Sequence, residues 1–391
     1  MDNLFIAALL IGALALLPLL CVFAVYPCLL FFKKAPPRQI NVQNQGTASE
    51  PTVTMLIAAR NGERLVEDKI NNCRALAYAK DKINFIFFSD GSTDNTLDLL
   101  NTHKFDAMTV LYDEQHIGKA KALNRAAEHT QADILVFSDL DAILVPDAIA
   151  QLTKHFSQPN VSGVCGQRAI ASDTGALKDA QKKYIKLDSW IKVQESKLGF
   201  LTSNDGKLYA IRREHHSPIA EGVTDDLYSA LAVINQGKQF VFEGQAKAFI
   251  KTPSRNSKHE ISRRRRITCR SLTGIAMFPA LLNPFKSGFF ASGLFINKVM
   301  RRLLPVSLLL LFASNLMLIP VHLLFKISMI LQCGFYLVAL FAPFVTKLPN
   351  KLTKLFNAIH YFVLGNIGVL LGMLDFVRNK RVIKWEPVKN D

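Results

Sequence analysis

Two aspartates separated by one residue follow an apolar run and are suited to binding a metal ion. Asp139 and Asp141 come directly after the run ILVFS at 134–138. Two carboxylates at this spacing in an extended segment can both contact one divalent ion, and such hard oxygen ligands together with phosphates suit Mg²⁺ or Mn²⁺. The same D-x-D pattern is common in solvated acidic turns. Its position at the end of an expected buried strand favours the metal site.

A second acidic pair, Asp225 and Asp226, stands at the start of an expected amphipathic helix. One carboxylate there can simply cap the helix. Alternatively, it can act as a general base whose pKa is set by a partly buried, cationic site. Asp90 also ends an apolar run, before the turn GSTDNT, where an ordinary strand–turn–helix junction is the competing interpretation.

Basic residues complete the set. Gly118 and Lys119 stand at an expected helix start, which favours binding of a phosphate by the helix N-terminus and the ammonium group. The spacing is not that of a P-loop. The run RRRRITCR at 263–270 fits a solvated basic face, a lipid-headgroup patch or a diphosphate clamp, and its place before long apolar runs favours the last two. Nucleic acid is disfavoured as a partner, because aromatic residues are not interleaved with these arginines.

Strand-like and helix-like segments alternate around these residues, which predicts a mainly parallel sheet covered on both faces. In such a sheet, ligands bind beyond the carboxyl ends of the strands. The expected strands are 53–59, 84–90, 108–113 and 132–139, and the expected helices are 63–76, 95–103 and 120–129.

The composition indicates a membrane protein. Half of the 391 residues are hydrophobic, and residues 4–32 carry no charge, which exceeds the roughly 20 residues needed to cross a bilayer. Lys33, Lys34 and Arg38 follow that run, so the positive-inside rule places the N-terminus outside and the next segment in the cytoplasm. The net charge of +16 favours an anionic partner, and six scattered cysteines without a C-x-x-C pair fit a reducing compartment.

We expect six parts along the chain. The run 356–377, with its polar residues, either crosses the membrane or is re-entrant. The parts are an N-terminal transmembrane anchor (1–34), a linker (35–51), an α/β domain (52–252), a basic region with interfacial helices (253–302), C-terminal transmembrane helices (303–377) and a basic tail (378–391).

Taken in order, seven motifs resemble those of the family 2 glycosyltransferases, in the membrane-embedded branch with the cellulose, chitin and hyaluronan synthases. Each motif alone is weak, but their order and spacing are specific. They cover about 50–275, and the membrane segments match most of the rest. The motifs are AARNGE (58–63), SDGSTD (89–94), GKAKALN (118–124), DLDA (139–142), SNDGKLYAIRR (203–213), TDD (224–226) and RRRRI (263–267).

The resemblance implies a Rossmann-like GT-A fold with a mixed, mainly parallel sheet, and a nucleotide-sugar donor at the strand ends. Asp226 would be the catalytic base, and Asp139 and Asp141 would hold Mg²⁺ or Mn²⁺ on the donor diphosphate. The other donor-binding residues implied are Ala59, Arg60, Glu63, Asp90, Lys119 and Arg266.

Two positions depart from the family pattern. Processive synthases carry Q-x-x-R-W, whose tryptophan forms a platform for the acceptor sugar. This chain has Arg263 for the glutamine and Ile267 for the tryptophan, which argues against long-chain processive synthesis. Ser89 replaces the usual first aspartate of its pair, while Asp90 is retained.

The resemblance therefore predicts an inverting glycosyltransferase of the inner (plasma) membrane, with its catalytic domain in the cytoplasm. It would act on a glycan or lipid-linked acceptor in the synthesis of cell-surface or exported polysaccharide, with membrane lipids and other assembly proteins as partners. The alternatives are a processive synthase that also exports its polymer, a non-catalytic nucleotide-sugar-binding membrane protein, and a metal-dependent phosphohydrolase.

Overall fold

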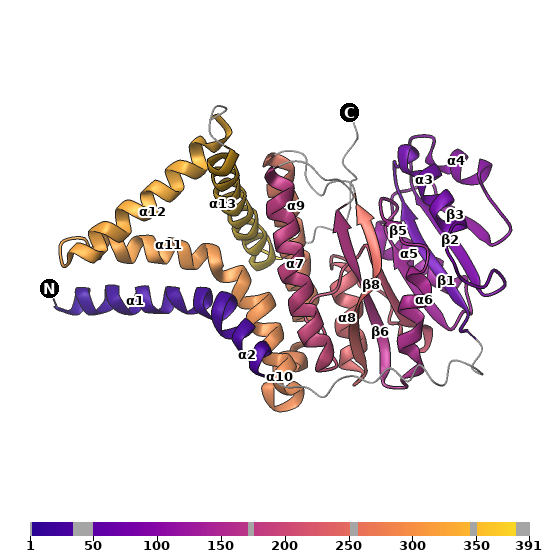
Figure 1. Cartoon of the computed structure of the whole chain (residues 1–391), viewed down its shortest axis with the longest axis horizontal. Helices are drawn as coiled ribbons and strands as arrows, with labels where there is room; N and C mark the ends of the chain where they lie inside the picture. Colours follow the sequence, from indigo (N-terminus) through magenta and orange to yellow (C-terminus); the bar gives the residue numbers. More distant parts are fainter. Residues whose placement is uncertain (1, 34–49, 171–175, 251–256, 345–349, 381–391) are drawn as a thin grey trace.

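An α/β region and a set of long apolar helices lie side by side in the computed structural model (Figure 1). The structure describes residues 2–33, 50–170, 176–250, 257–344 and 350–380. Helices α7 and α9 lie between the sheet and the apolar helices (Figure 1). The expected linker 35–51 and the basic tail 378–391 fall almost entirely outside the described residues.

The apolar runs form an eight-stranded sheet in the order β3-β2-β1-β4-β7-β6-β8-β5. Strands β1, β2, β3, β4, β6 and β8 run in one direction, while β5 and β7 run against it. The prediction of a mixed, mainly parallel sheet is therefore confirmed. The strands are β1 (Val53–Ala59), β2 (Ile83–Asp90), β3 (Met108–Asp113), β4 (Ile134–Ser138), β5 (Ile143–Leu144), β6 (Val161–Ile170), β7 (Leu208–Arg212) and β8 (Gln239–Ile250).

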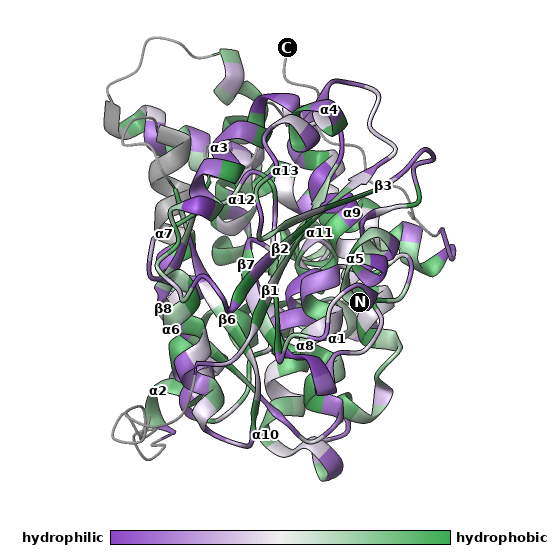
Figure 2. Ribbon diagram, turned by 90° about the vertical axis from the view of Figure 1, so that its right-hand side faces the viewer, coloured by the Kyte–Doolittle hydropathy of each residue, from purple (hydrophilic) through white to green (hydrophobic). Residues whose placement is uncertain are grey.

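Alternate residues of each strand point to opposite faces, and helices cover both faces. On β1, Met55 and Ile57 pack towards α3, α4 and α6, while Leu56 and Ala58 pack towards α5 and α8. Figure 2 shows hydrophobic residues in the sheet and mixed hydrophobic and hydrophilic segments on the helices around it. The covering helices are α3 (Glu63–Arg74), α4 (Thr96–Thr102), α5 (Lys119–Glu128), α6 (Ala148–Thr153) and α8 (Asp225–Asn235).

Four helical segments are long and apolar enough to cross a membrane among the described residues: Asn3–Phe32, Pro284–Leu318, Leu323–Phe344 and Leu352–Val377. The first comprises α1 (Asp2–Leu20), a π-helical turn (Cys21–Val25) and α2 (Tyr26–Phe32). The second comprises α10 (Pro284–Leu294), a second π-helical turn (Phe295–Met300) and α11 (Arg301–Leu318). This stretch is kinked at Gly288, and the boundary expected at 302 falls inside its longer helical part. The remaining long helices are α7 (Ala176–Lys197), α9 (Ser257–Ala276), α12 (Leu323–Phe341) and α13 (Asn350–Val377).

Helix α13 packs along α9, and two of its polar residues bind neighbouring helices. Asp375 accepts hydrogen bonds from Arg265 at 2.5 and 2.8 Å. A Cβ added to Gly372 would lie 2.4 Å from the Arg265 carbonyl, so the two helices approach closely at this point. His360 bonds the Ala339 carbonyl of α12 at 2.7 Å. Two of the polar groups in the run 356–377 thus bind neighbouring helices, while Asn366 donates to the Phe362 carbonyl of its own helix at 2.8 Å.

Candidate active site

The sheet brings the predicted acidic residues to one edge. Strands β1, β2 and β4 end there, and β7, which runs in the opposite direction, begins there. Ser138 pairs with Leu208, so Asp139 directly after β4 lies opposite Lys207 directly before β7. This arrangement follows from the strand directions, because parallel strands place their carboxyl ends at a common edge.

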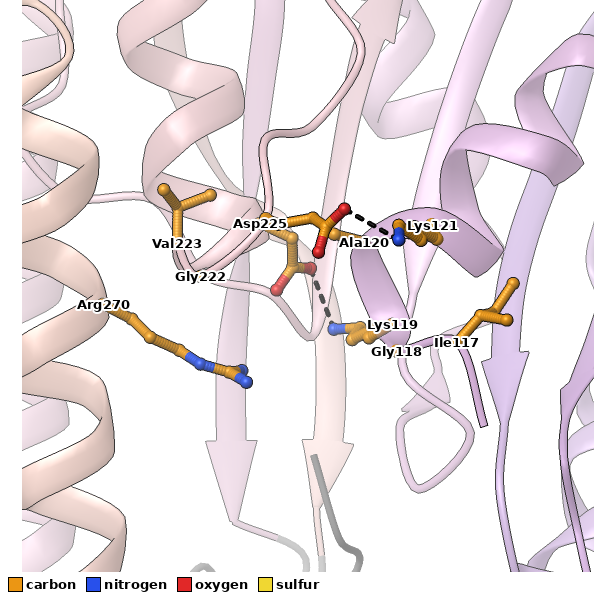
Figure 3. A pocket seen from close by; sticks show the side chains of 10 residues that line it. Ile117, Gly118, Lys119, Ala120, Lys121, Gly222, Val223, Asp225 and Arg270 are labelled. Carbon is orange, nitrogen blue, oxygen red and sulfur yellow. Dashed lines mark hydrogen bonds and ion pairs between the residues drawn. The ribbon is translucent and has the colours of Figure 1, made fainter. Parts of the chain in front are cut away.

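Five charged side chains at this edge form a continuous line of ion pairs. Lys207 Nζ lies 2.7 Å from Asp141 Oδ1 and 2.9 Å from Asp139 Oδ2. Lys119 Nζ then lies 2.7 Å from Asp139 Oδ1 and 2.8 Å from Asp225 Oδ2. Figure 3 shows the Lys119–Asp225 pair at the wall of a pocket. The structure therefore brings Lys119, Asp139 and Asp141 together, as the sequence predicts, and adds Lys207 and Asp225.

Mutual attraction keeps Asp139 and Lys119 charged although both side chains are partly buried. Burial alone would raise the pKa of Asp139, but Lys119 and Lys207 outweigh it and hold that pKa well below its usual range. Burial alone would lower the pKa of Lys119, but Asp139 and Asp225 raise it instead. Both groups are therefore ionised at neutral pH, and the lysines are cations that phosphate oxygens can share.

Asp226 lies in a different environment from its neighbour. Its Oδ1 accepts a hydrogen bond from the Leu227 amide at 2.7 Å, and its carbonyl accepts one from Asn204 at 3.0 Å. Burial and the adjacent Asp225 raise the pKa of Asp226 to about 6. A carboxylate with this pKa is ionised at neutral pH yet basic enough to accept a proton, which is what a general base requires.

Asp90 is buried and binds the loop before α5. Its carboxylate accepts hydrogen bonds from the amides of Ile117 at 2.7 Å and Gly118 at 3.0 Å, and it lies 2.9 Å from His116 Nδ1. Gly118 has φ of +93°, which a residue with a side chain rarely adopts. Asp90 thus positions the turn that carries Lys119, and its expected contact with a nucleotide stays a prediction.

The loop after β1 is tied to the same edge. Ala59 is buried at the end of β1. Arg60 Nη1 donates to the carbonyls of Asp90 and Gly91, both at 2.9 Å. Glu63 accepts a hydrogen bond from the Asn95 amide at 3.2 Å. These contacts join the two loops that the sequence assigns to the nucleotide, and their roles in binding stay predictions.

A pocket opens beside Lys119 and Asp225, and Arg270 reaches towards it from α9 (Figure 3). Arg266, the arginine that the motif singled out, lies one turn earlier and is not among the lining residues. Burial, Arg270 and Arg263 lower the pKa of Arg266 to about 10. The lining residues are Ile117, Gly118, Lys119, Ala120, Lys121, Glu221, Gly222, Val223, Asp225 and Arg270.

Sequence reasoning missed Lys69, which supports the site from behind. Lys69 is fully buried, and its Nζ donates to Ser138 Oγ at 2.8 Å and to the Ala142 carbonyl at 2.7 Å. The ammonium thereby holds both ends of the segment that carries Asp139 and Asp141. A signal was present, since this lysine stands between Val66 and Ile70 on the apolar face of α3.

Comparisons with known proteins show which families the sequence resembles. The family model described as Glycosyl transferase family 2 matches residues 54–217. A beta-monoglucosyldiacylglycerol synthase of Nostoc sp. is 28% identical over 225 residues, 55% of this chain and 47% of the relative. A poly-beta-1,6-N-acetyl-D-glucosamine synthase of Staphylococcus aureus is 28% identical over 184 residues, 46% of this chain and 44% of the relative. The chain thus spans about half the length of these curated relatives.

A solved structure shares the fold. The mannosyltransferase of Pyrobaculum calidifontis, in complex with GDP-Man and Mn²⁺, has a TM-score of 0.69 at 20% identity. The likeness covers 95% of this chain and 99% of that one, so it includes the long apolar helices. The predicted GT-A-like fold is confirmed by this likeness. Residues 54–217 of the chain, which carry the line of ion pairs as far as Lys207, therefore belong to glycosyl transferase family 2.

Proposed function

We propose that the chain is an inverting glycosyltransferase that moves a sugar from a nucleotide-sugar donor to a hydroxyl of a glycan or lipid-linked acceptor. The observation that carries the proposal is the line of ion pairs from Asp141 to Asp225, beside the pocket and next to Asp226. It combines carboxylates for a metal, cations for a diphosphate and a base with a raised pKa within one site.

The proposed reaction is one displacement. The acceptor oxygen attacks the anomeric carbon, the bond from that carbon to the diphosphate oxygen breaks, and the diphosphate leaves with the electron pair. Asp226 takes the proton of the acceptor hydroxyl. Lys119, Lys207 and Arg270 supply the positive charge that stabilises the leaving group.

Asp139 and Asp141 fit a divalent ion, because both already contact the single ammonium of Lys207. Within the described part of the chain no group of three or more His, Cys, Asp or Glu is placed to hold a metal. Two carboxylates plus donor phosphates would therefore make up the ligand set, and a bound Mg²⁺ or Mn²⁺ would neutralise charge on the diphosphate.

We further propose that the 52–252 region faces the cytoplasm of a cell with an inner membrane, following the positive flank after the first apolar run. The named relatives make a glycolipid and a polysaccharide, and both acceptor classes suit a site next to membrane helices. At the position of the usual tryptophan, Ile267 is 36% exposed and offers no aromatic platform. Addition of one or a few sugars to a membrane-held acceptor is therefore favoured over export of a long polymer.

The detergent-purified protein should release nucleoside diphosphate from one of a panel of nucleotide sugars when Mn²⁺ or Mg²⁺ is present. We expect a short or lipid-linked product, sized by mass spectrometry after extraction with solvent. A long polymer would restore the processive alternative. Absence of release with every donor, while nucleotide still binds, would contradict the proposed activity and favour a non-catalytic binding protein.

Arg270 should contribute more than Arg266 to donor binding, because Arg270 lines the pocket. Arg270→Gln is expected to raise the KM for the donor about 10- to 100-fold, the range of a charge-assisted hydrogen bond to a diphosphate. Arg266→Gln is the matched control on the same helix and should have a smaller effect. If Arg266→Gln instead weakened nucleoside diphosphate binding more than Arg270→Gln, Arg266 would be the residue that binds the diphosphate.

A further inference from the structure

A buried hydrogen-bond network joins the membrane helices to the loop 202–207, which lies between α7 and β7. Glu195, near the end of α7, is fully buried. Its Oε1 accepts hydrogen bonds from the hydroxyls of Tyr26 at 2.5 Å and Thr202 at 2.6 Å, and its Oε2 accepts one from the Thr202 amide at 2.8 Å. One carboxylate therefore binds both the first apolar helix and the start of the loop.

The second apolar helical stretch contacts the same loop. Asn297 Nδ2 donates to Thr202 Oγ1 at 2.7 Å, and Lys298 Nζ donates to Ser203 Oγ at 2.8 Å. Both donors lie in the π-helical turn Phe295–Met300, and the other π-helical turn directly precedes Tyr26. The two turns pack against each other. Turns of π-helix rotate side chains relative to an α-helix and recur at functional sites. The packing of two such turns here therefore favours a functional role for this contact.

The other end of the loop contacts the proposed catalytic groups. Asn204 donates to the Asp226 carbonyl at 3.0 Å, and a Cβ added to Gly206 would lie 3.7 Å from the Asp226 side chain. Asp205 accepts a hydrogen bond from the Lys207 amide at 3.2 Å, and the Lys207 ammonium pairs with Asp139 and Asp141. Six consecutive residues therefore connect the membrane helices to both the base and the metal-binding carboxylates.

Burying a carboxylate at this junction is costly, since burial raises the pKa of Glu195 despite its three donors. An apolar contact of similar volume would join the helices at least as stably. The directional hydrogen bonds of Glu195 instead fix the positions of the Tyr26 and Thr202 side chains. We propose that Glu195 is a positioning residue, which couples the docking of the membrane helices through Tyr26 and Thr202 to the placement of Asp226 and Lys207. The expected effect on kcat rests on the proposed function.

Glu195→Gln tests the coupling in the full-length protein in detergent. The glutamine side chain has one acceptor oxygen for three donors, so at least one hydrogen bond is lost. We expect kcat to fall about 10-fold, with the donor KM within about twofold, because the pocket lining is untouched. Tyr26→Phe should lower kcat about threefold, and the double variant should be no worse than Glu195→Gln, because both changes break one link.

Hydrogen exchange gives a readout that does not need activity. In Glu195→Gln, amides of 202–207 and 225–227 should exchange faster, while those of β2 should not change. Glu243→Gln is the matched control, since Glu243 is also buried and binds His155 at 2.8 Å away from the loop. It should lower the melting temperature and leave kcat within about twofold.

Gly293→Ala provides a variant that keeps the carboxylate. Its Cβ would lie 2.7 Å from the Tyr26 hydroxyl and 3.1 Å from Thr202 Cγ2, so it should displace both partners of Glu195 and change kcat and exchange at least as much as Tyr26→Phe. Unchanged kcat and exchange in both Glu195→Gln and Gly293→Ala would overturn the coupling, and so would loss of donor binding in step with kcat. A wild-type protein without turnover would defeat the proposed function, while exchange would still decide the coupling.

Discussion

Asp226→Asn is expected to lower kcat for sugar transfer by about 10³-fold while leaving the Kd of the donor within a few-fold. The amide keeps the volume of the side chain but cannot take the proton of the acceptor hydroxyl, and general bases contribute roughly 10²- to 10⁴-fold. The groups that we propose bind the donor, Lys119, Lys207 and Arg270, are unchanged in this variant. Product formation and equilibrium titration with nucleoside diphosphate measure the two effects separately. Loss of binding to the same extent as transfer would refute the role of base.

The raised pKa of Asp226 gives the same assignment an independent signature. With that pKa at about 6, wild-type kcat should fall about tenfold per pH unit below 6 and level off above it. Because the folded-state pKa lies above that of the unfolded chain, Asp226 contributes stability at acidic pH that is lost as the pH rises to about 6. Asp226→Asn should therefore raise the free energy of unfolding at pH 7.5, by up to about 3 kcal/mol.

Asp225→Asn is the control for this pH dependence. Removing the neighbouring negative charge should lower the pKa of Asp226, so the acidic limb of the profile should move to lower pH. A profile that stays in place would mean that burial alone sets the pKa. If the residual activity of Asp226→Asn shows the same decrease below pH 6, the group that titrates there is not Asp226.

Local sequence patterns were sufficient to predict the edge of the sheet where the site lies. The apolar runs predict β1 to β4, and the residues directly after them are the ones that parallel strands place together. Asp139 and Asp141 after β4, and Lys119 at the start of α5, were therefore within reach of sequence reasoning. The same reasoning found the start of α8 at Asp225.

Contacts between distant parts of the chain could not be predicted in the same way. Lys207 meets Asp141 across 66 residues, and Tyr26 meets Glu195 across 169. Each contact depends on how the elements pack in the folded chain. The sequence pattern of one element does not indicate which distant residue it will contact. Arg266 and Arg270 lie one turn apart on the same face of α9, so the choice of Arg270 as the pocket residue depends on the position of α9 along its own axis. A motif match alone places the arginine only to within one helical turn.

Asp139→Asn is expected to weaken metal-dependent donor binding about 100-fold, because it removes one of the two proposed metal ligands, a carboxylate that also pairs with Lys119 and Lys207. In titrations with nucleoside diphosphate, the gain in affinity on adding Mn²⁺ should largely disappear. Asp141→Asn is the matched control, since its side chain is 45% exposed and pairs with Lys207 alone. It should show a similar but smaller loss. Unchanged metal dependence in both variants would contradict the metal-binding role.

Stability separates this role from that of the base. The pKa of Asp139 is held below its usual range, so its pairing contributes stability above about pH 4 that is lost as the pH falls. Asp139→Asn should therefore lower the free energy of unfolding at neutral pH, whereas Asp226→Asn should raise it. The two substitutions should thus have opposite effects on stability and different effects on donor binding. This is the result expected if Asp139 is a metal ligand paired with lysines and Asp226 is a buried base. A decrease in stability for both would mean that Asp226 is held by pairing as well, and its assignment as the base would fail.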